Sequence, residues 1–518
     1  MLEPQLVVGV LAAVLAGSWS ARWLRLPAPL VLVAVGSLIG IVPALTNVTL
    51  PPETVLLIFL PVLLYWESLT TSLREIRRMM RGIILTGTLL VAATAAAIAG
   101  VLHLLGVPWG TAWIIGAALG PTDATAVAAM SRGLPRRAYV VLQAESLIND
   151  GTALVIYALA LGTATGAIQP TVLDTGGRFV VSFGGGVLIG LVVGWLLFRV
   201  RIAVEEPVLV NLVALLVPFA AYLAAEEVGG SGVVAVVTAG LYASQAAPRA
   251  VVAQARTQGS AFWGLTTFVL NAALFVLVGV QLPRSSVQLT TDTLAHAALL
   301  VCAAHGTMVV TRYAFLNLSI GIIRLLDRRP HQRTLRTTHR GRLVSTVAGF
   351  RGAVSVAVAL SVPADYVGRD LIVFVVGTAV VVTLVLNGFA LPRVIRWARL
   401  PADTSQDEEL RTARVAELRA ALAALPDLAR THGVDQGAVD LVRDDLTDRL
   451  VTVESDGAEG RPADRAAMAA LRLGVVAVER DALVSLRDDG TIDDTVLRLL
   501  QAELDAEENR LRGLLDAG

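Results

Sequence analysis

Two carboxylates, an amide and a hydroxyl lie close together within the otherwise apolar run 138–161. Glu145 and Asn149 are four residues apart, as are Ser146 and Asp150, so a helix places these side chains on two neighbouring ridges. The run is long enough to cross a bilayer, where a carboxylate is costly and by default marks an ion or proton site with a partner elsewhere. The alternatives are a helix end that reaches water and a buried polar cluster that only fixes packing.

Further charged residues fall inside apolar runs, although most of the 16 acidic residues in the stretch 1–400 lie at the ends of such runs. A charge in hydrocarbon is strongly unfavourable unless it is paired or hydrated. Several charges at this depth therefore indicate a shared polar centre. The acidic members are Glu67, Asp123, Glu145 and Asp150, and the basic members are Arg312 and Arg351.

Two of the apolar runs contain a segment that should open the helix. In Gly120-Pro121-Thr122-Asp123 the proline removes a backbone donor and disfavours helix at the preceding residue. Gly349-Phe350-Arg351-Gly352 places two glycines around a charge and can open in the same way. Interrupted helices at matching places in two halves of a chain indicate a transporter site. Glycine and proline that serve only helix packing are the alternative.

Composition indicates a polytopic membrane protein of the all-α class. The chain of 518 residues is 55% hydrophobic and 16% charged, whereas about a quarter of the residues in a soluble protein are charged. The single cysteine, Cys302, excludes a disulfide framework and a thiolate metal site. Apolar blocks of membrane-span length predict thirteen transmembrane helices. They cover about 5–22, 28–46, 53–67, 82–105, 112–131, 138–161, 178–200, 207–225, 230–246, 258–281, 292–323, 340–361 and 369–397.

The arginines test this count independently. The connections after the odd-numbered blocks are rich in arginine, with seven between Arg324 and Arg342, whereas the opposite connections hold only Arg178, Arg284 and Arg369. By the positive-inside rule the N-terminus lies outside and the C-terminus in the cytoplasm, which predicts a multi-pass protein of the cell membrane.

A change of composition near Pro401 predicts a domain boundary, with domains at 1–400 and 401–518. The first part holds 28 arginines against 16 acids, and the second holds 14 arginines against 26 acids. The second part reads as a cytoplasmic helical domain with a regulatory or assembly role. Its acidity would allow docking on basic loops, although charged helices are usually only solvated. Its expected helices are Glu408–Leu425, Gln436–Val453, Arg465–Leu486 and Thr491–Leu515, with breaks at Pro426, Asp456–Pro462 and Asp489-Gly490.

The two opened segments and the run Glu145-Ser146-Leu147-Ile148-Asn149-Asp150 together resemble the signatures of the NhaP/NHE-type sodium–proton antiporters. The resemblance covers roughly residues 1–400. It implies thirteen spans in inverted six-helix repeats, two crossed unwound helices, a homodimer, and transport of Na⁺ and H⁺ without a cofactor. It implies neither an enzyme nor a nucleic-acid partner.

The same resemblance assigns roles to individual residues. Asp150 matches the carboxylate that takes cation or proton, and Asn149 matches its neutral neighbour. The matches to groups that coordinate Na⁺ are Ser146, Asp123 and the Thr122 backbone, with Glu67 a looser match to a further acid. Glu145 and Arg351 match a buried ion pair that holds the core together, and Arg312 resembles a core charge without an assigned role.

These residues predict electroneutral exchange in which Na⁺, and by extension Li⁺, competes with H⁺ for Asp150. Hydroxyl, carbonyl and carboxylate oxygens are the ligands that a small hard cation prefers. A K⁺/H⁺ antiporter on the same scaffold is the first alternative, because the same oxygens can serve a larger ion. An intramembrane aspartyl protease that uses Asp123 and Asp150, or a cation channel, is a more remote alternative.

Overall fold

The protein divides into two compact units, Met1–Ala402 and Asp403–Gly518. The computed structural model describes residues 4–42, 55–71, 82–130, 136–166, 172–251, 253–288, 291–326, 338–399, 405–455, 462–489 and 494–516, together with Leu73, Ile76 and Leu134. Pro401, at the predicted domain boundary, and most of the predicted break at 456–462 lie outside these residues.

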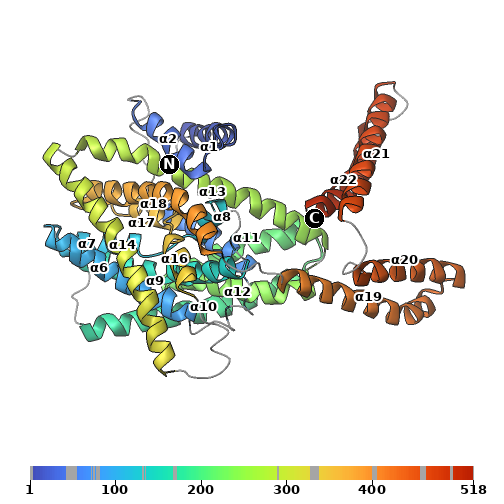
Figure 1. The fold of residues 1–518 in the computed structure, drawn as a ribbon, viewed down its shortest axis with the longest axis horizontal. Helices are drawn as coiled ribbons and strands as arrows, with labels where there is room; N and C mark the ends of the chain where they lie inside the picture. The colour runs from blue at the N-terminus through green and yellow to red at the C-terminus, as the bar shows by residue number, and fades with distance from the viewer. Residues whose placement is uncertain are drawn as a thin grey trace. The chain divides into compact units, whose positions relative to one another are not determined.

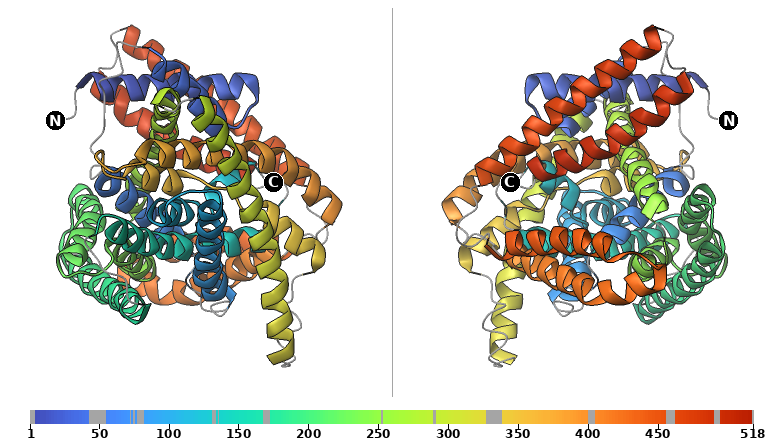
Figure 2. Two further views of the ribbon diagram at one scale, coloured as in Figure 1. Left: turned by 90° about the vertical axis from the view of Figure 1, so that its left-hand side faces the viewer. Right: turned by 90° about the vertical axis from the view of Figure 1, so that its right-hand side faces the viewer.

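The first unit is a bundle of helices (Figure 1). The two side views show α14, the yellow ribbon, reaching beyond its neighbours at one end (Figure 2). The helices are α1 (Pro4–Leu24), α2 (Ala28–Gly40), η2 (Val55–Phe59), α4 (Leu60–Thr70), η3 (Leu85–Leu90), α6 (Val91–Leu104), α7 (Trp109–Leu119), α8 (Ala124–Met130), α9 (Arg136–Ala164), α10 (Val172–Ala203), α11 (Pro207–Glu227), α12 (Gly232–Ala250), α13 (Ala253–Gln288), α14 (Thr291–Leu326), α16 (His339–Val347), α17 (Ala353–Leu360) and α18 (Arg369–Ala398).

Eight spans among the described residues are long and apolar enough to cross a membrane, judged by length and composition. They lie in α1, η3 with α6, α9, α10, α11, α13, α14 and α18. Shorter apolar helices include α2, α7 and α12. The expectation of a nearly all-helical protein with many apolar helices is confirmed.

Close backbone contact fixes helices of the bundle against one another. At the crossing of α2 and α13, a Cβ atom added to Gly36 would lie 2.2 Å from the Val276 carbonyl oxygen, and one added to Gly279 would lie 2.3 Å from that of Val33. Glycine is therefore required on both helices, as is common where membrane helices pack without a hydrophobic driving force.

The chain leaves the helical conformation at both segments where the sequence predicts an opening. The helix α7 stops at Leu119 and α8 begins at Ala124, so Gly120–Asp123 form a short link that belongs to neither helix. The second break separates α16, which ends at Val347, from α17, which begins at Ala353. The two links contact each other, because the Asp123 amide donates to the Phe350 carbonyl oxygen over 2.9 Å.

The second unit consists of two helix pairs, α19 (Ser405–His432) with α20 (Gln436–Ser455) and α21 (Pro462–Asp488) with α22 (Asp494–Asp516). The predicted break at Pro426 is wrong, because α19 continues through the proline to His432. Contact with α20 compensates for the missing backbone hydrogen bond, and the helix ends instead before Gly433, which has a left-handed φ of 62°. Arg480 on α21 donates to Asp505 and Glu508 on α22 over 2.6 and 2.7 Å.

Candidate ion-binding site

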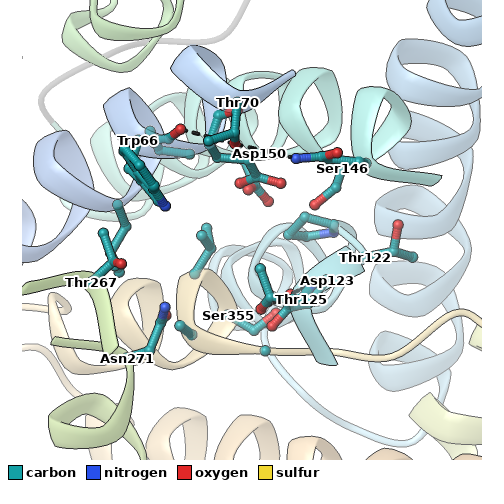
Figure 3. A pocket seen from close by; sticks show the side chains of 18 of the residues that line it. Trp66, Thr70, Thr122, Asp123, Thr125, Ser146, Asp150, Thr267, Asn271 and Ser355 are labelled. Carbon is teal, nitrogen blue, oxygen red and sulfur yellow. Dashed lines mark hydrogen bonds between the residues drawn. The ribbon is translucent and has the colours of Figure 1, made fainter. Parts of the chain in front are cut away.

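A cavity of about 220 Å³ lies where the two interrupted helices face α9, α4 and α13 (Figure 3). Five of the predicted site residues line it, namely Glu67, Thr122, Asp123, Ser146 and Asp150. The fold thus gathers these five residues around one space, although they come from three separate regions of the sequence.

The first break owes its shape to Asp123. Its Oδ1 atom accepts hydrogen bonds from the Thr125 amide at 2.7 Å, the Thr125 hydroxyl at 2.6 Å and the Ala126 amide at 3.2 Å. A carboxylate in this position satisfies the free amides at the N-terminus of α8 and opposes its positive dipole end. Its Oδ2 atom lies against Gly352, only 1.5 Å from where a Cβ on that residue would be. Asp123 therefore holds the two breaks together.

Arg351 neutralises the opposite end of the same break. Its Nη1 atom donates to the Gly120 carbonyl oxygen at 3.0 Å and to the Pro121 carbonyl oxygen, both of which the interruption leaves without helical partners. Its Nε atom contacts the sulfur of Met308 at 3.2 Å, and the residue is 2% exposed. A cation from one broken helix thus stabilises the exposed carbonyls of the other.

The polar stretch of α9 is buried and faces this junction. Asn149 donates through Nδ2 to the Thr122 hydroxyl at 2.8 Å, and Ser146 accepts a long bond of 3.5 Å from the Ala124 amide. Asp150 is 4% exposed and makes no hydrogen bond to another described residue. Asn149 therefore fastens α9 to the first break, while the carboxylate of Asp150 faces the cavity (Figure 3).

Two buried oxygens at the cavity lack partners among the described residues. They are Oε1 of Glu67 and Oγ of Ser355, which lies in the first turn of α17. A buried polar atom without a hydrogen bond is unfavourable, and such atoms in a native fold indicate a water or ion that completes their coordination. Together with the Asp150 carboxylate, these atoms supply oxygen ligands from three helices, α4, α9 and α17, which suits a hard monovalent cation.

The predicted ion pair between Glu145 and Arg351 is wrong. Glu145 instead contacts Arg312 of α14, with Oε1 and Nη1 2.8 Å apart as a charge contact rather than an aligned hydrogen bond. Both side chains are at most 4% exposed, and Arg312 Nε also donates to the Ser345 carbonyl oxygen at 2.9 Å. Nη1 of Arg351 is occupied by carbonyls of the first break and its Nε by Met308, and the second core arginine, Arg312, forms the ion pair with Glu145.

Comparison with known proteins gives the family. Residues 10–397 match the family described as "Sodium/hydrogen exchanger, transmembrane". The chain belongs to the sodium/hydrogen exchanger family. This is a family of multi-pass membrane transporters of monovalent cations and protons, not of enzymes, so the expected class of activity and the resemblance to NhaP/NHE-type antiporters are confirmed.

Individual relatives agree with this membership. An uncharacterized Na⁺/H⁺ exchanger of Mycobacterium tuberculosis is 41% identical over 99% of this chain and 96% of its own length. A sodium, potassium, lithium and rubidium/H⁺ antiporter of Bacillus pumilus is 28% identical over 77% of this chain and 62% of its own. The structure of the antiporter MjNhaP1 from Methanocaldococcus jannaschii superimposes with a TM-score of 0.59 at 19% identity, covering 76% of this chain and 98% of that one. That likeness shows a shared fold.

Sequence reasoning overlooked other polar residues that line the cavity of this exchanger. Gln143 precedes Ser146 and Asp150 by three and seven residues, so helical spacing could have found it. Thr267 and Asn271 are four residues apart inside the apolar run of α13, which is a similar signal. Ser355 carried no such signal, since a lone serine in an apolar helix is common in membrane proteins.

Proposed function

We propose that this protein exchanges Na⁺ for H⁺ across the membrane, with both ions competing for Asp150. A carboxylate that binds a cation must be ionised, and one that carries a proton has lost that charge, so one site cannot hold both. Exchange follows if the core moves between the two sides only when the site holds one of the two ions. Li⁺ is the expected second substrate, because it prefers the same oxygen ligands.

The observation that carries the proposal is the set of unsatisfied oxygens around one small cavity. Asp150 has no hydrogen bond to a described residue, and the buried oxygens of Glu67 and Ser355 likewise lack partners. Ser146 and Thr122 also line the cavity, and we assign the Ser146 hydroxyl and the Thr122 backbone carbonyl as further ligands. A cation at Asp150 would relieve the unfavourable burial of these atoms. Asp123 contributes charge, although its Oδ1 atom already caps α8.

The lining of the cavity comes mainly from one side of the bundle. This supports alternating access, in which the site opens to one side of the membrane at a time. Thr70 lies at the end of α4, Thr125 follows the first break, and Tyr139 and Gln143 lie near the start of α9. These ends precede or follow the arginine-rich connections, which the positive-inside rule places in the cytoplasm. Towards the other side the buried Ser361 hydroxyl donates to the Tyr157 hydroxyl at 3.0 Å. We therefore assign this conformation as open to the cytoplasm.

Exchange should be electroneutral. Asn149 is neutral and is held by Thr122, so Asp150 is the titrating carboxylate at this position of α9. One proton then replaces one monovalent cation. Dependence of the native protein's transport rate on membrane potential would contradict this assignment.

K⁺/H⁺ exchange on the same site is the second candidate. It is favoured by the similarity to the Bacillus pumilus protein, whose name includes sodium, potassium, lithium and rubidium. A cavity of about 220 Å³ also has room for the larger ion. An aspartyl protease is disfavoured because Asp123 is engaged with amides of α8 rather than paired with Asp150. A channel would not require the protonatable carboxylate.

The architecture we propose with this function has thirteen crossings in two inverted six-helix repeats, with α10 as the linker between them. The two breaks then occupy corresponding positions in the repeats. The N-terminus would lie outside and the C-terminus in the cytoplasm of the cell, with two copies forming a homodimer. The acidic second unit would have a regulatory or assembly role, and the exchanger would contribute to pH homeostasis.

Proteoliposomes that contain an internal pH dye test the proposal. Adding Na⁺, Li⁺ or K⁺ outside should drive protons out and change the dye signal, and the order of the responses gives the cation preference. Asp150→Ala should give no response with any of the three. A normal response from that variant, or no response to any cation from the native protein, would overturn the proposal. Repeating the assay with valinomycin-clamped potentials tests electroneutrality.

A further inference from the structure

A second hollow lies apart from the ion cavity, where the end of α18 meets the start of α16. We call it the arginine hollow, and its volume is about 570 Å³. Its lining consists of Arg340, Arg393, Arg396, Trp397 and Arg399. Four guanidinium groups thus surround one open space.

No acidic residue in the described part of the chain pairs with the positive charge of the hollow. None of the four arginines forms an ion pair with another residue that the structure describes. Like charges held close together repel one another, so an anion bound between them would stabilise the arrangement. The start of α16 adds the positive end of a helix dipole, with Thr338 as its N-cap accepting from the Gly341 amide.

One wall of the hollow is ordered by an aromatic contact. The Arg340 guanidinium lies over the ring of Trp397 at 5.4 Å from the ring centroid. This cation–π contact restricts the arginine before any ligand binds. Trp397 itself is 53% exposed, as is typical of tryptophans at the level of lipid headgroups.

The position of the hollow relative to the membrane indicates which anion could reach it. The apolar helix α18 is long enough to cross a bilayer and ends at Ala398, so its last turn lies at one membrane surface. Arginine binds phosphate through paired N–H groups. A basic pocket between membrane helices at the arginine-rich side fits the headgroup of an anionic lipid.

We propose that the arginine hollow binds the phosphate of an anionic phospholipid in the leaflet on the C-terminal side of α18. The four guanidinium groups hold the phosphate, and Trp397 packs against the part of the lipid next to the headgroup. The site is independent of cation exchange at Asp150, so either proposal can fail without the other.

Lipid titration of the full chain tests this site. Native mass spectrometry of the purified protein in detergent would follow dioctanoyl phosphatidylglycerol, with dioctanoyl phosphatidylcholine and inorganic phosphate as comparison probes. The double variant Arg340→Gln/Arg396→Gln should bind phosphatidylglycerol about 25-fold more weakly, since each basic group near a membrane surface contributes about fivefold. Arg396→Lys keeps the charge but loses the paired N–H groups, so it should weaken binding less than the double variant does.

Arg199→Gln is the matched control. Arg199 lies 5.7 Å from the ring centroid of Trp195 at the end of α10, so it is an interfacial Arg–Trp pair outside the hollow. Its substitution should leave phosphatidylglycerol affinity unchanged. The proposal is overturned if the double variant binds as the native protein does, or if phosphatidylcholine or inorganic phosphate binds equally well. It is also overturned if hydrogen exchange shows that the double variant loses protection of α19–α22 amides whether or not lipid is present, because the arginines would then bind the acidic second unit.

Discussion

Replacing Arg312 by alanine should destabilise the first unit more than replacing Glu145, and replacing both should cost less than the sum. The two charges are 2.8 Å apart and at most 4% exposed, so removal of one leaves the other buried without its counter-charge. Such losses cost about 3–5 kcal/mol. The double variant leaves neither charge buried alone, so its loss of unfolding free energy should be smaller than the sum of the two single losses.

The other contacts of each residue set the order of the effects. Arg312 keeps its hydrogen bond to the Ser345 carbonyl when Glu145 is lost, so Glu145→Ala should fall near 3 kcal/mol, at the lower end of the roughly 3–5 kcal/mol range. Glu145 accepts no hydrogen bond from another described residue that would replace Arg312, so Arg312→Ala should fall near the upper end of that range, at about 5 kcal/mol. The double-mutant cycle should give a coupling of about 2 kcal/mol or more.

Equilibrium unfolding in mixed detergent–SDS micelles, followed by tryptophan fluorescence, measures these free energies. The control cycle pairs Glu145→Ala with Arg351→Ala and should give a clearly smaller coupling, because Arg351 is bound to the carbonyls of the first break. Additive effects for Glu145 and Arg312 would refute the reasoning. So would a Glu145→Ala protein that has native stability but cannot exchange ions, since that result would place Glu145 in the transport step.

Three further predictions concern other contacts. Gly352→Ala should abolish exchange and lower thermal stability, because its Cβ would lie 1.5 Å from Asp123 Oδ2. Gly377→Ala should be milder in the same two assays, because the atoms nearest to its Cβ are side-chain carbons at 2.8 Å or more. Ser355→Ala should raise the apparent KM for Na⁺ roughly tenfold without changing the maximal rate, because it removes one oxygen that we propose as a Na⁺ ligand. A lower rate at unchanged KM would indicate a structural role. Hydrogen bonds from two arginines hold the pKa of Glu508 below its ordinary value. Glu508 therefore stabilises the pairing of α21 and α22 above its unfolded-state pKa, and this stabilisation is lost as pH falls through its folded-state pKa. Protection of α22 amides, corrected for intrinsic exchange, should show this loss, and Glu508→Gln should remove it.

The sequence located the parts of the site that depend on local chemistry. Pro121 and the glycines beside Arg351 interrupt their helices through backbone effects that act within a few residues, and the structure has breaks at both places. The spacing of Ser146 and Asp150 likewise placed both on one side of α9, where both line the cavity.

Contacts between distant helices could not be read in the same way. The sequence contains two core arginines that could pair with Glu145. The choice of Arg312 depends on how α14 packs and on the backbone carbonyls that bind Arg351. The contribution of α13 to the cavity through Thr267 and Asn271 is also a product of packing. Pro426 shows the opposite error, since a local helix-breaking signal was outweighed by contact between α19 and α20.

The dependence of the apparent KM for Na⁺ on pH, measured in proteoliposomes, tests competition at Asp150 most directly. If one proton and one Na⁺ exclude each other, the apparent KM should rise about tenfold for each pH unit on the acidic side, with the maximal rate at saturating Na⁺ unchanged. An apparent KM that stays constant while the maximal rate changes with pH would contradict the account.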